Sequence, residues 1–546
     1  MRALVDEVAA RLLLRHPGFS SAAPEPTPDG EARAGKAARH AASIAGDLCA
    51  DVTVLADARR ACARLAATAE TSLANARVLL HEDGEVSAAH RILVRAAEGV
   101  RDQGAGQVGC EDILWSLVMA CWLTGRPEHR ESLDRYMTDS GALFTPGLRA
   151  AVRGILDPAA EPGWLQEQIE SLDCQSEPAE IVRIAGASAF VGYLPDCRQA
   201  LHRVACPDPV SRFGIPGAQA SILLALEAYQ TGQWAEADRL ATTTAEQCAT
   251  EGYELLRRQA QSVLAFVAAA RGDATTALAL ADEIARWAAP RGLHSLLASA
   301  QHACLLATLA HSDFTGAYRH AARILPAGGP AADQPFAAWA LLDIVEAALR
   351  ADRREEAEAY LHAIRQSHLV ASSPRMALVS TAARAMTAPD KEASVLFEQA
   401  LAVDDGGRFP FERARVHLMA GERLRRMRAV REARAHLGAA HEDFRRLGAQ
   451  SWARRAAMGL RAVGLIAPDE DPDDRSQVLT ERELGIARLA AAGLSNKEIG
   501  NRLHMSHRTV ASHLYRMFPR LGIASRAALG TVLHSIEAGS EFTSGP

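Results

Sequence analysis

The sequence predicts an all-α protein, and three observations lead to this fold class. Hydrophobic residues make up 48% of the 546 residues but aromatic residues only 5%, and alanine recurs throughout. Small side chains of this kind suit helices that pack closely against one another. Apolar residues recur at three- and four-residue spacing, and one part of the chain repeats with a regular period. A chain this long is expected to form several domains or a repeat array.

The first part of the chain is predicted to contain helices without a clear repeat. Residues 1–39 are expected to form an N-terminal helix and a flexible segment rich in proline and glycine. Asp6, Glu7 and Arg11 interrupt the apolar residues of that helix, so it lacks the continuous apolar centre of a signal peptide. Residues 40–215 are predicted to form a helical region. Runs of about eighteen apolar residues do not occur in the sequence, so no membrane span is expected.

A repeat emerges between residues 216 and 466. A short turn precedes an alanine four times at intervals of 40 residues, and two weaker members follow at intervals of 36 and 40. Four residues after each alanine comes another apolar residue, which predicts a helical stripe that buries one pair of helices against the next. The period exceeds about 34 residues, so we expect tetratricopeptide-like pairs with longer helices. The alanines are Ala237, Ala277, Ala317, Ala357, Ala393 and Ala433, and the apolar residues that follow them are Ala241, Ala281, Ala321, Leu361, Phe397 and Leu437.

The sequence gives little sign of catalysis or of a bound cofactor. The nine cysteines are scattered without a C-x-x-C pair, which is typical of reduced thiols in a cytoplasmic protein. The segment Gly30–Ala37 resembles a P-loop, but Ala37 has no hydroxyl for magnesium and the residues before it cannot form the required strand. No metal-ligand spacing or catalytic set stands out. We therefore expect no enzyme activity, no metal and no cofactor.

The clearest domain boundary is an acidic linker at residues 467–477, which separates the repeats from a basic module at residues 478–540. The linker contains two prolines and five acids. Within residues 479–535 there are eight bases and three acids, a net charge of 8 − 3 = +5. The whole chain carries −6, so the remainder carries −6 − 5 = −11. A basic module on an acidic body is the distribution expected when attraction to phosphates is confined to one part of the chain.

The module contains the signals of three short helices joined by tight turns. Thr480 with Glu483 and Ser495 with Glu498 form two capping boxes, and Ser506 is a third N-cap. Gly493 is placed where the first helix should stop. The predicted core consists of the apolar residues that recur at helical spacing, namely Ile486, Leu489, Ile499, Leu503, Val510, Leu514 and Met517.

The third helix carries a polar stripe on the side opposite this core. A stripe of this kind is free to enter the major groove of a DNA duplex. Its members are Arg508, Ala511, Ser512, Tyr515 and, at the edge, Arg516.

The module resembles a known family. L-T-x-R-E, then G-L-S-N-K-E-I, L-x-x-S-x-x-T-V and L-G-I-x-S-R are similar to the LuxR-type helix-turn-helix domain from Leu479 to about Leu533. Residues 411–456 resemble the helical segment that precedes this domain in large LuxR-type regulators. The resemblance implies a four-helix DNA-binding domain whose third helix reads the major groove. It also implies a fourth helix, at about residues 526–536, that often mediates dimerisation.

The resemblance assigns roles to individual residues by position. Lys497, Arg508 and Thr509 would approach phosphates, and Arg516 could contact either a phosphate or a base. Ala511, Ser512 and Tyr515 would face base edges.

The module departs from the family pattern at two positions in the third helix. Ala511 stands where the family usually has a basic residue, so it can contact a thymine methyl group at most. Pro519 lacks an amide hydrogen, which predicts that the helix ends or kinks near Met517. In the first helix, Gly485 costs about 1 kcal/mol relative to alanine.

These features favour a cytoplasmic transcriptional regulator that binds double-stranded DNA. Its helical repeats are expected to receive a signal from a protein partner or a small-molecule effector, and its last helix to support a homodimer. The alternative hypothesis is a helical-repeat interaction scaffold with weak or no specific DNA binding. A third and weaker hypothesis is an ATP-dependent switch.

Overall fold

The structure is a computed structural model, and the residues that it describes begin at Ala69. The predicted N-terminal segment 1–39, with its P-loop-like residues, and the predicted linker 467–477 lie outside the described residues. The described ranges are 69–103, 107–140, 144–156, 163–172, 176–205, 214–325, 338–366, 373–403, 407–464, 481–503, 505–521, 523, 526–530 and 532–533.

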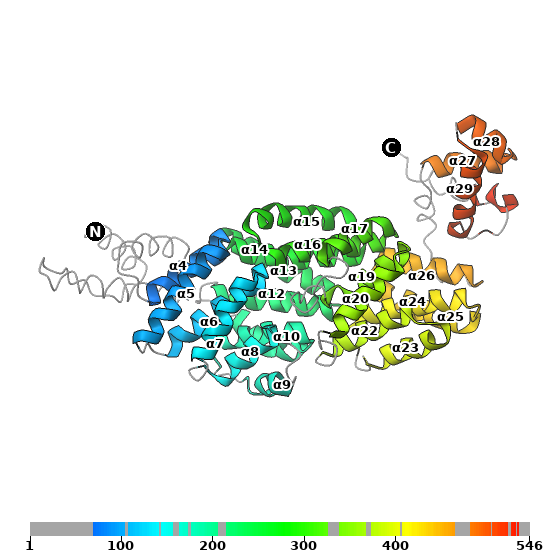
Figure 1. Ribbon diagram of the computed structural model, residues 1–546. Helices are drawn as coiled ribbons and strands as arrows, with labels where there is room; N and C mark the ends of the chain where they lie inside the picture. Colours follow the sequence, from blue (N-terminus) through cyan, green and yellow to red (C-terminus); the bar gives the residue numbers. More distant parts are fainter. Residues whose placement is uncertain are drawn as a thin grey trace, which may run out of the picture. The chain divides into compact units, whose positions relative to one another are not determined.

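Every regular element in the described ranges is a helix, which confirms the all-α fold class. Helices that are neighbours in the chain pack against each other (Figure 1). By packing, the chain divides into two compact units, one up to Arg413 and one from Ala414 onwards. The predicted domain boundaries stay predictions.

The first unit begins with helices that enclose a large apolar core. Arg183 is buried and forms ion pairs with two partly buried carboxylates, those of Glu111 and Asp112. The helices are α4 (Ala69–Val78), η1 (Leu79–Asp83), α5 (Val86–Gln103), α6 (Gln107–Thr124), α7 (Pro127–Ser140), α8 (Pro146–Leu156), α9 (Gly163–Glu170), α10 (Pro178–Val191), η3 (Leu194–Cys197) and α11 (Arg198–Ala205).

Paired helices follow throughout the region where the sequence repeats. Within each pair, three residues at most connect the first helix to the second. The pairs are α12 (Ile215–Gln230) with α13 (Trp234–Glu251), α14 (Glu254–Arg271) with α15 (Ala274–Ala288), α16 (His294–Ala310) with α17 (Phe314–Ile324), α19 (Leu341–Arg350) with α20 (Arg354–Gln366), α22 (Pro374–Thr387) with α23 (Asp390–Val403), and α24 (Pro410–Arg426) with α25 (Val430–Leu447).

The repeated alanines occupy the same place in all six pairs. Each is the fourth residue of the second helix and has no exposed surface, as Ala237 in α13 and Ala433 in α25 illustrate. The apolar residue one turn later is also buried in each case, with an exposed fraction of 7% or less. A methyl group at this place lets the second helix approach its neighbours closely. The sequence repeat therefore marks a packing position, although the likeness to tetratricopeptide units stays a prediction.

The turn inside one pair differs from the turns inside the other five. Five residues before the alanine, five of the six pairs have a residue with a left-handed backbone, such as Gly272 with a φ of 93°. At the pair with the 36-residue interval, the corresponding residue Ala388 has a φ of −65° and an extended backbone. The other left-handed residues are Gly232, Ser312, Asp352 and Arg428.

In the second unit, α24 and α25 pack with α26 (Gln450–Ala462) around a leucine of the repeat stripe. The Leu437 side chain lies so close to Gly421 and Gly459 that a Cβ atom on either glycine would come within 2.8 Å of it. A buried ion pair joins the helices, with Arg455 Nε 2.8 Å from Glu422 Oε1. These helices include residues 411–456, which the sequence analysis found similar to the helical segment that precedes the C-terminal domain in large regulators.

Cysteines of the described ranges behave as core residues. Five thiols are free and buried, and desolvation by burial raises their pKa values, to about 12 for Cys121 and Cys248. A thiol that stays protonated at neutral pH is a poor nucleophile. No helix in the described part of the chain combines the length and the apolar character that crossing a membrane requires.

The left-handed residue Asp352 offers a test of the turn geometry. Glycine adopts a φ of 62° without the steric cost that a Cβ atom brings, whereas alanine does not. We expect Asp352→Gly to raise the melting temperature by about 1–2 °C, measured by differential scanning calorimetry. Asp352→Ala is the matched control and should give no increase. An equal increase for both variants would show that the aspartate carboxylate, rather than the backbone, determines stability here.

Candidate nucleic-acid interface

The C-terminal module consists of three helices and a short fourth helical segment. The helices are α27 (Glu481–Ala491), α28 (Asn496–Leu503) and α29 (His507–Arg520). The turn η6 (Arg526–Ala528) and helical residues 529–530 and 532–533 follow. Every residue of the predicted core belongs to the apolar cluster of this module, and Leu529 and Leu533 of the fourth segment complete it.

The start of α28 is a capping box, as predicted. Ser495 donates its backbone amide and its hydroxyl to Glu498 Oε2, each at 2.7 Å, and the Glu498 amide donates back to Ser495 Oγ at 3.4 Å. These hydrogen bonds favour the ionised carboxylate and lower the pKa of Glu498 below its ordinary value. The box therefore fixes where α28 begins. Thr480, the predicted first residue of the other box, lies outside the described residues.

The predicted N-cap of α29 and the predicted stop of α27 are also present. The Thr509 amide donates to Ser506 Oγ at 3.0 Å, and the Ser506 and Thr509 hydroxyl oxygens lie 2.7 Å apart. Gly493 follows α27 with a φ of 87°, and the Leu494 amide reaches back to the Leu489 carbonyl at 3.2 Å. A left-handed glycine with this hydrogen bond is the usual end of a helix.

Gly500 holds α28 against the turn that leads into α29. A Cβ atom at this position would lie 2.5 Å from the Met505 carbonyl oxygen, which is backbone and cannot rotate away. The Met505 amide in turn donates to the Gly500 carbonyl at 2.9 Å. Because only glycine fits, this position determines how closely the two helices cross. The sequence analysis did not identify Gly500, although a glycine in the middle of a short helix is the signal that could have done so.

One face of α29 is directed away from the core. Arg508, Ala511 and Tyr515 occupy positions i, i+3 and i+7 of the helix and are all exposed. The Tyr515 side chain keeps 81% of its surface exposed, the largest fraction for any large hydrophobic residue in the described ranges. An exposed tyrosine can offer both its ring and its hydroxyl group to a partner. Ser512 and Arg516 lie in the same helix, but their side chains are outside the described structure.

Lys497 and Thr509 stand at the first turns of α28 and α29, where backbone amides are unpaired. Both are exposed, and within the described structure Lys497 and Arg508 have no ion pair. Helix N-termini and free cations both attract phosphates. The seven predicted site residues thus lie in α28 and α29. Their roles toward a ligand stay predictions.

Arg526 has a structural contact that the sequence did not indicate. Its guanidinium donates to Asn496 Oδ1 at 2.8 Å and also to the Leu494 carbonyl. These two bonds tie the fourth segment to the start of α28. Arg526 therefore adds positive charge to the module, but its guanidinium is engaged in hydrogen bonds within the protein.

Of the expected end or kink of the third helix near Met517, the end is wrong and the kink stays a prediction. Helix α29 continues to Arg520, through Pro519. A proline removes a single amide donor, and the regular pattern resumes at once because the Leu521 amide donates to the Met517 carbonyl at 2.9 Å. The fourth segment begins at Arg526 as expected, while residues 534–536 of its predicted range lie outside the described residues.

Comparison with known proteins agrees with this geometry. Residues 477–533 match the family described as "Bacterial regulatory proteins, luxR family". The nitrate/nitrite response regulator protein NarP of Escherichia coli is 35% identical over 94 residues, which are 17% of this chain and 42% of NarP. A nitrate/nitrite response regulator protein homolog of Haemophilus influenzae is 43% identical over 61 residues, 11% of this chain and 29% of the relative. Fimbriae Z protein of Escherichia coli is 44% identical over 48 residues, 9% and 23% of the two chains. This chain thus spans less than half the length of each of these three relatives.

Two glycines of the module provide a matched test of the helix crossing. Gly500→Ala should destabilise the module by about 1–3 kcal/mol, because the added methyl group overlaps the Met505 carbonyl. Gly485→Ala should stabilise it by about 1 kcal/mol, because no atom lies within 4 Å of the added Cβ and alanine favours helices. Hydrogen exchange of residues 481–521 in the full chain measures both changes. Changes of the same sign in the two variants would contradict the close approach at Gly500.

The capping box predicts a pH dependence. Because the folded-state pKa of Glu498 is lowered, its contribution to stability is present above the ordinary carboxyl range and is lost as pH falls through the folded pKa. We expect Glu498→Gln to melt at a lower temperature than the unaltered chain at pH 7. The difference should disappear as pH falls below about 4. A difference that is constant between pH 7 and pH 3 would mean that the charge of Glu498 plays no part.

Proposed function

We propose that this chain, whose residues 477–533 form a LuxR-type helix-turn-helix domain, is a bacterial transcriptional regulator that binds double-stranded DNA. The observation that carries the proposal is the exposed face of α29, where Arg508, Ala511 and Tyr515 point away from the core. A helix that follows a tight turn and presents such a face has the form of a major-groove reading helix.

The geometry suggests that some site residues contact phosphates and others contact bases. Lys497 and Arg508 are free cations at the starts of α28 and α29, and they would neutralise phosphates. Ala511 and Tyr515 lie further along the exposed face and would contact bases, Ala511 through a thymine methyl group. The hydroxyl of Thr509 is bonded to Ser506, so Thr509 would approach a phosphate mainly through the end of the helix. Ser512 and Arg516 are assigned by their places in α29.

The remaining parts of the proposal concern the rest of the chain. We assign signal reception, from a protein partner or a small-molecule effector, to the paired helices of the first unit. A homodimer would form through residues 526–536. In this segment Leu529 and Leu533 are used by the core of the domain, whereas Gly530 is exposed, so the contact would have to come from Gly530 and other residues outside that core. The protein would act in the cytoplasm, where its DNA lies, without enzyme activity or cofactor.

Selection from random duplexes with the full chain tests the proposal directly. We expect enrichment of a defined sequence and an affinity that falls steeply as salt rises, because cations on the protein displace counterions from DNA. Genome-wide mapping in the source bacterium should then show occupied promoters. If selection enriches no sequence while a protein partner copurifies in fixed proportion, the chain is the interaction scaffold instead.

Single substitutions on the exposed face separate phosphate contacts from base contacts. Arg508→Ala should lower the affinity about tenfold for all duplexes and reduce the slope of log affinity against log salt by about 1. Tyr515→Ala should reduce the preference for the selected sequence over random duplexes about tenfold. Fluorescence anisotropy with labelled duplexes measures both.

Arg286→Ala is the matched control for loss of a cation. Arg286 lies in α15 of the first unit with 73% of its side chain exposed, and it forms an exposed ion pair with Asp282. Its loss should leave both the affinity and the salt slope unchanged. An effect equal to that of Arg508→Ala would mean that general charge, and not the face of α29, determines binding.

A further inference from the structure

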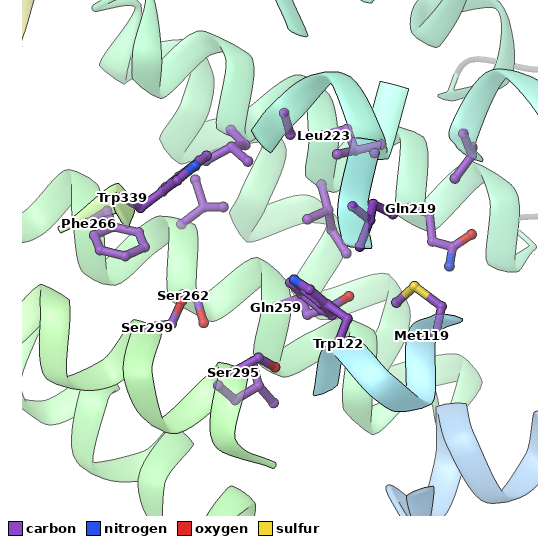
Figure 2. Close-up of a pocket in the computed structure, with 18 of the residues that line it drawn as sticks. Met119, Trp122, Gln219, Leu223, Gln259, Ser262, Phe266, Ser295, Ser299 and Trp339 are labelled. Carbon is purple, nitrogen blue, oxygen red and sulfur yellow. The ribbon is translucent and has the colours of Figure 1, made fainter. Parts of the chain in front are cut away.

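A pocket of mainly apolar lining lies in the first unit, whereas the proposed DNA interface belongs to the second unit. Its walls come from α6, α8, α10, α12, α14 and α16, and Trp339 just before α19 completes them. Figure 2 shows the labelled side chains gathered around this space. The pocket thus joins the non-repeating helices at the start of the unit to the first three repeated pairs.

Aromatic side chains are concentrated in this pocket. Three of the seven tryptophans of the chain line it, although aromatic residues make up only 5% of the sequence. Trp115, Trp122 and Trp339 are each only partly buried, and all three line the pocket. Phe266 also faces the pocket (Figure 2). Rings of this kind stack against a flat ligand more favourably than against a saturated one.

Uncharged polar groups interrupt the apolar wall. Ser295 is 3% exposed, and its hydroxyl is buried without a hydrogen-bond partner among the described residues. Gln219, Gln259 and Ser299 also line the pocket and make no side-chain hydrogen bond within the described structure. A buried hydroxyl without a partner costs free energy, which a ligand that completes the bond would recover.

Formal charge is nearly absent from the wall. Among the described residues that line the pocket, His302 is the one ionisable side chain. Its Nε2 lies 2.7 Å from Asp343 Oδ2, so the imidazole is already paired with a carboxylate behind the wall. A charged ligand would lose its hydration here without gaining an opposite charge. The pocket therefore selects against ions.

The size of the pocket limits the ligand further. Its volume is about 170 Å³. An apolar cavity of about 150 Å³ holds one benzene molecule. The pocket is also partly open, so a second ring or a substituent can extend from it.

We infer that this pocket binds an uncharged aromatic molecule of one or two rings that carries a hydrogen-bonding group. The rings would lie among the tryptophans, and the polar group would bond to the free serine and glutamine side chains. That such a ligand acts as the effector of a regulator rests on the proposed function. Binding itself does not depend on DNA, so the two can fail separately.

Calorimetric titration of the full chain, without DNA, tests the site with a matched set of probes. Benzamide and naphthalene-2-carboxamide carry a neutral amide, benzoate and naphthalene-2-carboxylate have the same shape with a negative charge, and decahydronaphthalene-2-carboxamide lacks aromatic rings. We expect a dissociation constant below about 1 mM for at least one aromatic amide. The corresponding carboxylate and the saturated amide should bind at least tenfold more weakly.

A glycine in the wall allows the pocket to be filled without disturbing the fold. Gly186 lies in α10, and no atom lies within 4 Å of a Cβ built on it. Gly186→Leu should therefore place its side chain in the pocket, weaken probe binding at least tenfold and leave the melting temperature unchanged or higher. Gly438→Leu is the matched control, because Gly438 lies in α25 with equally open space around its Cβ. It should bind the probe as the unaltered chain does.

The inference is overturned if no aromatic amide binds, if the carboxylates bind as tightly as the amides, or if Gly186→Leu binds as tightly as Gly438→Leu. Binding with the expected pattern supports the site even where the chain selects no DNA sequence. In that case the proposed regulator function fails and the ligand site remains.

Discussion

Close approach of helices through side chains no larger than a methyl group is the constraint on which both units depend. In the paired helices, an alanine without exposed surface stands at the fourth residue of every second helix. In the second unit, Leu437 fits between two glycines, and at the turn before α29 Gly500 meets a backbone carbonyl. A larger side chain at these places would separate the helices, and a packed interior tolerates such overlap poorly.

The same constraint positions the proposed DNA interface. Gly500 brings α28 close to the turn at Met505. Helix α29 begins after that turn, and its apolar side packs against Ile486, Ile499 and the rest of the cluster. The opposite side is then the one that carries Arg508 and Tyr515. The capping groups Ser495 and Ser506 fix where the two helices begin, so the register of this face follows from local hydrogen bonds.

Features carried by residues near one another in the sequence could be predicted. The capping box at Ser495 and the core of the module depend on spacings of three or four residues, and the structure contains both. The repeated alanines, found from their interval of about 40 residues, are buried at one place in their helices. The P-loop-like segment and the acidic linker lie outside the described residues, and their interpretation stays a prediction. The extent of α29 was underestimated, because the rule that proline ends a helix ignores how readily the hydrogen bonds resume after Pro519.

Features that depend on residues far apart in the sequence could not be predicted. The ion pairs of Arg183 with Glu111 and Asp112 join residues 72 and 71 positions apart. The hydrogen bonds of Arg526 with Leu494 and Asn496 join residues that are 32 and 30 positions apart. The pocket combines side chains from Trp115 to Trp339, and none of its members stands out locally. Such sites arise only when packing brings the helices together.

Photo-crosslinking from position 515 tests the central claim most directly. The full chain with p-benzoylphenylalanine in place of Tyr515 would be irradiated with its selected duplex, and the adducts mapped. The account predicts crosslinks to bases in the major groove, which excess unlabelled duplex of the same sequence suppresses. Crosslinks to other residues of the protein alone, with none to DNA, would show that this face of α29 is covered in solution and would contradict the account.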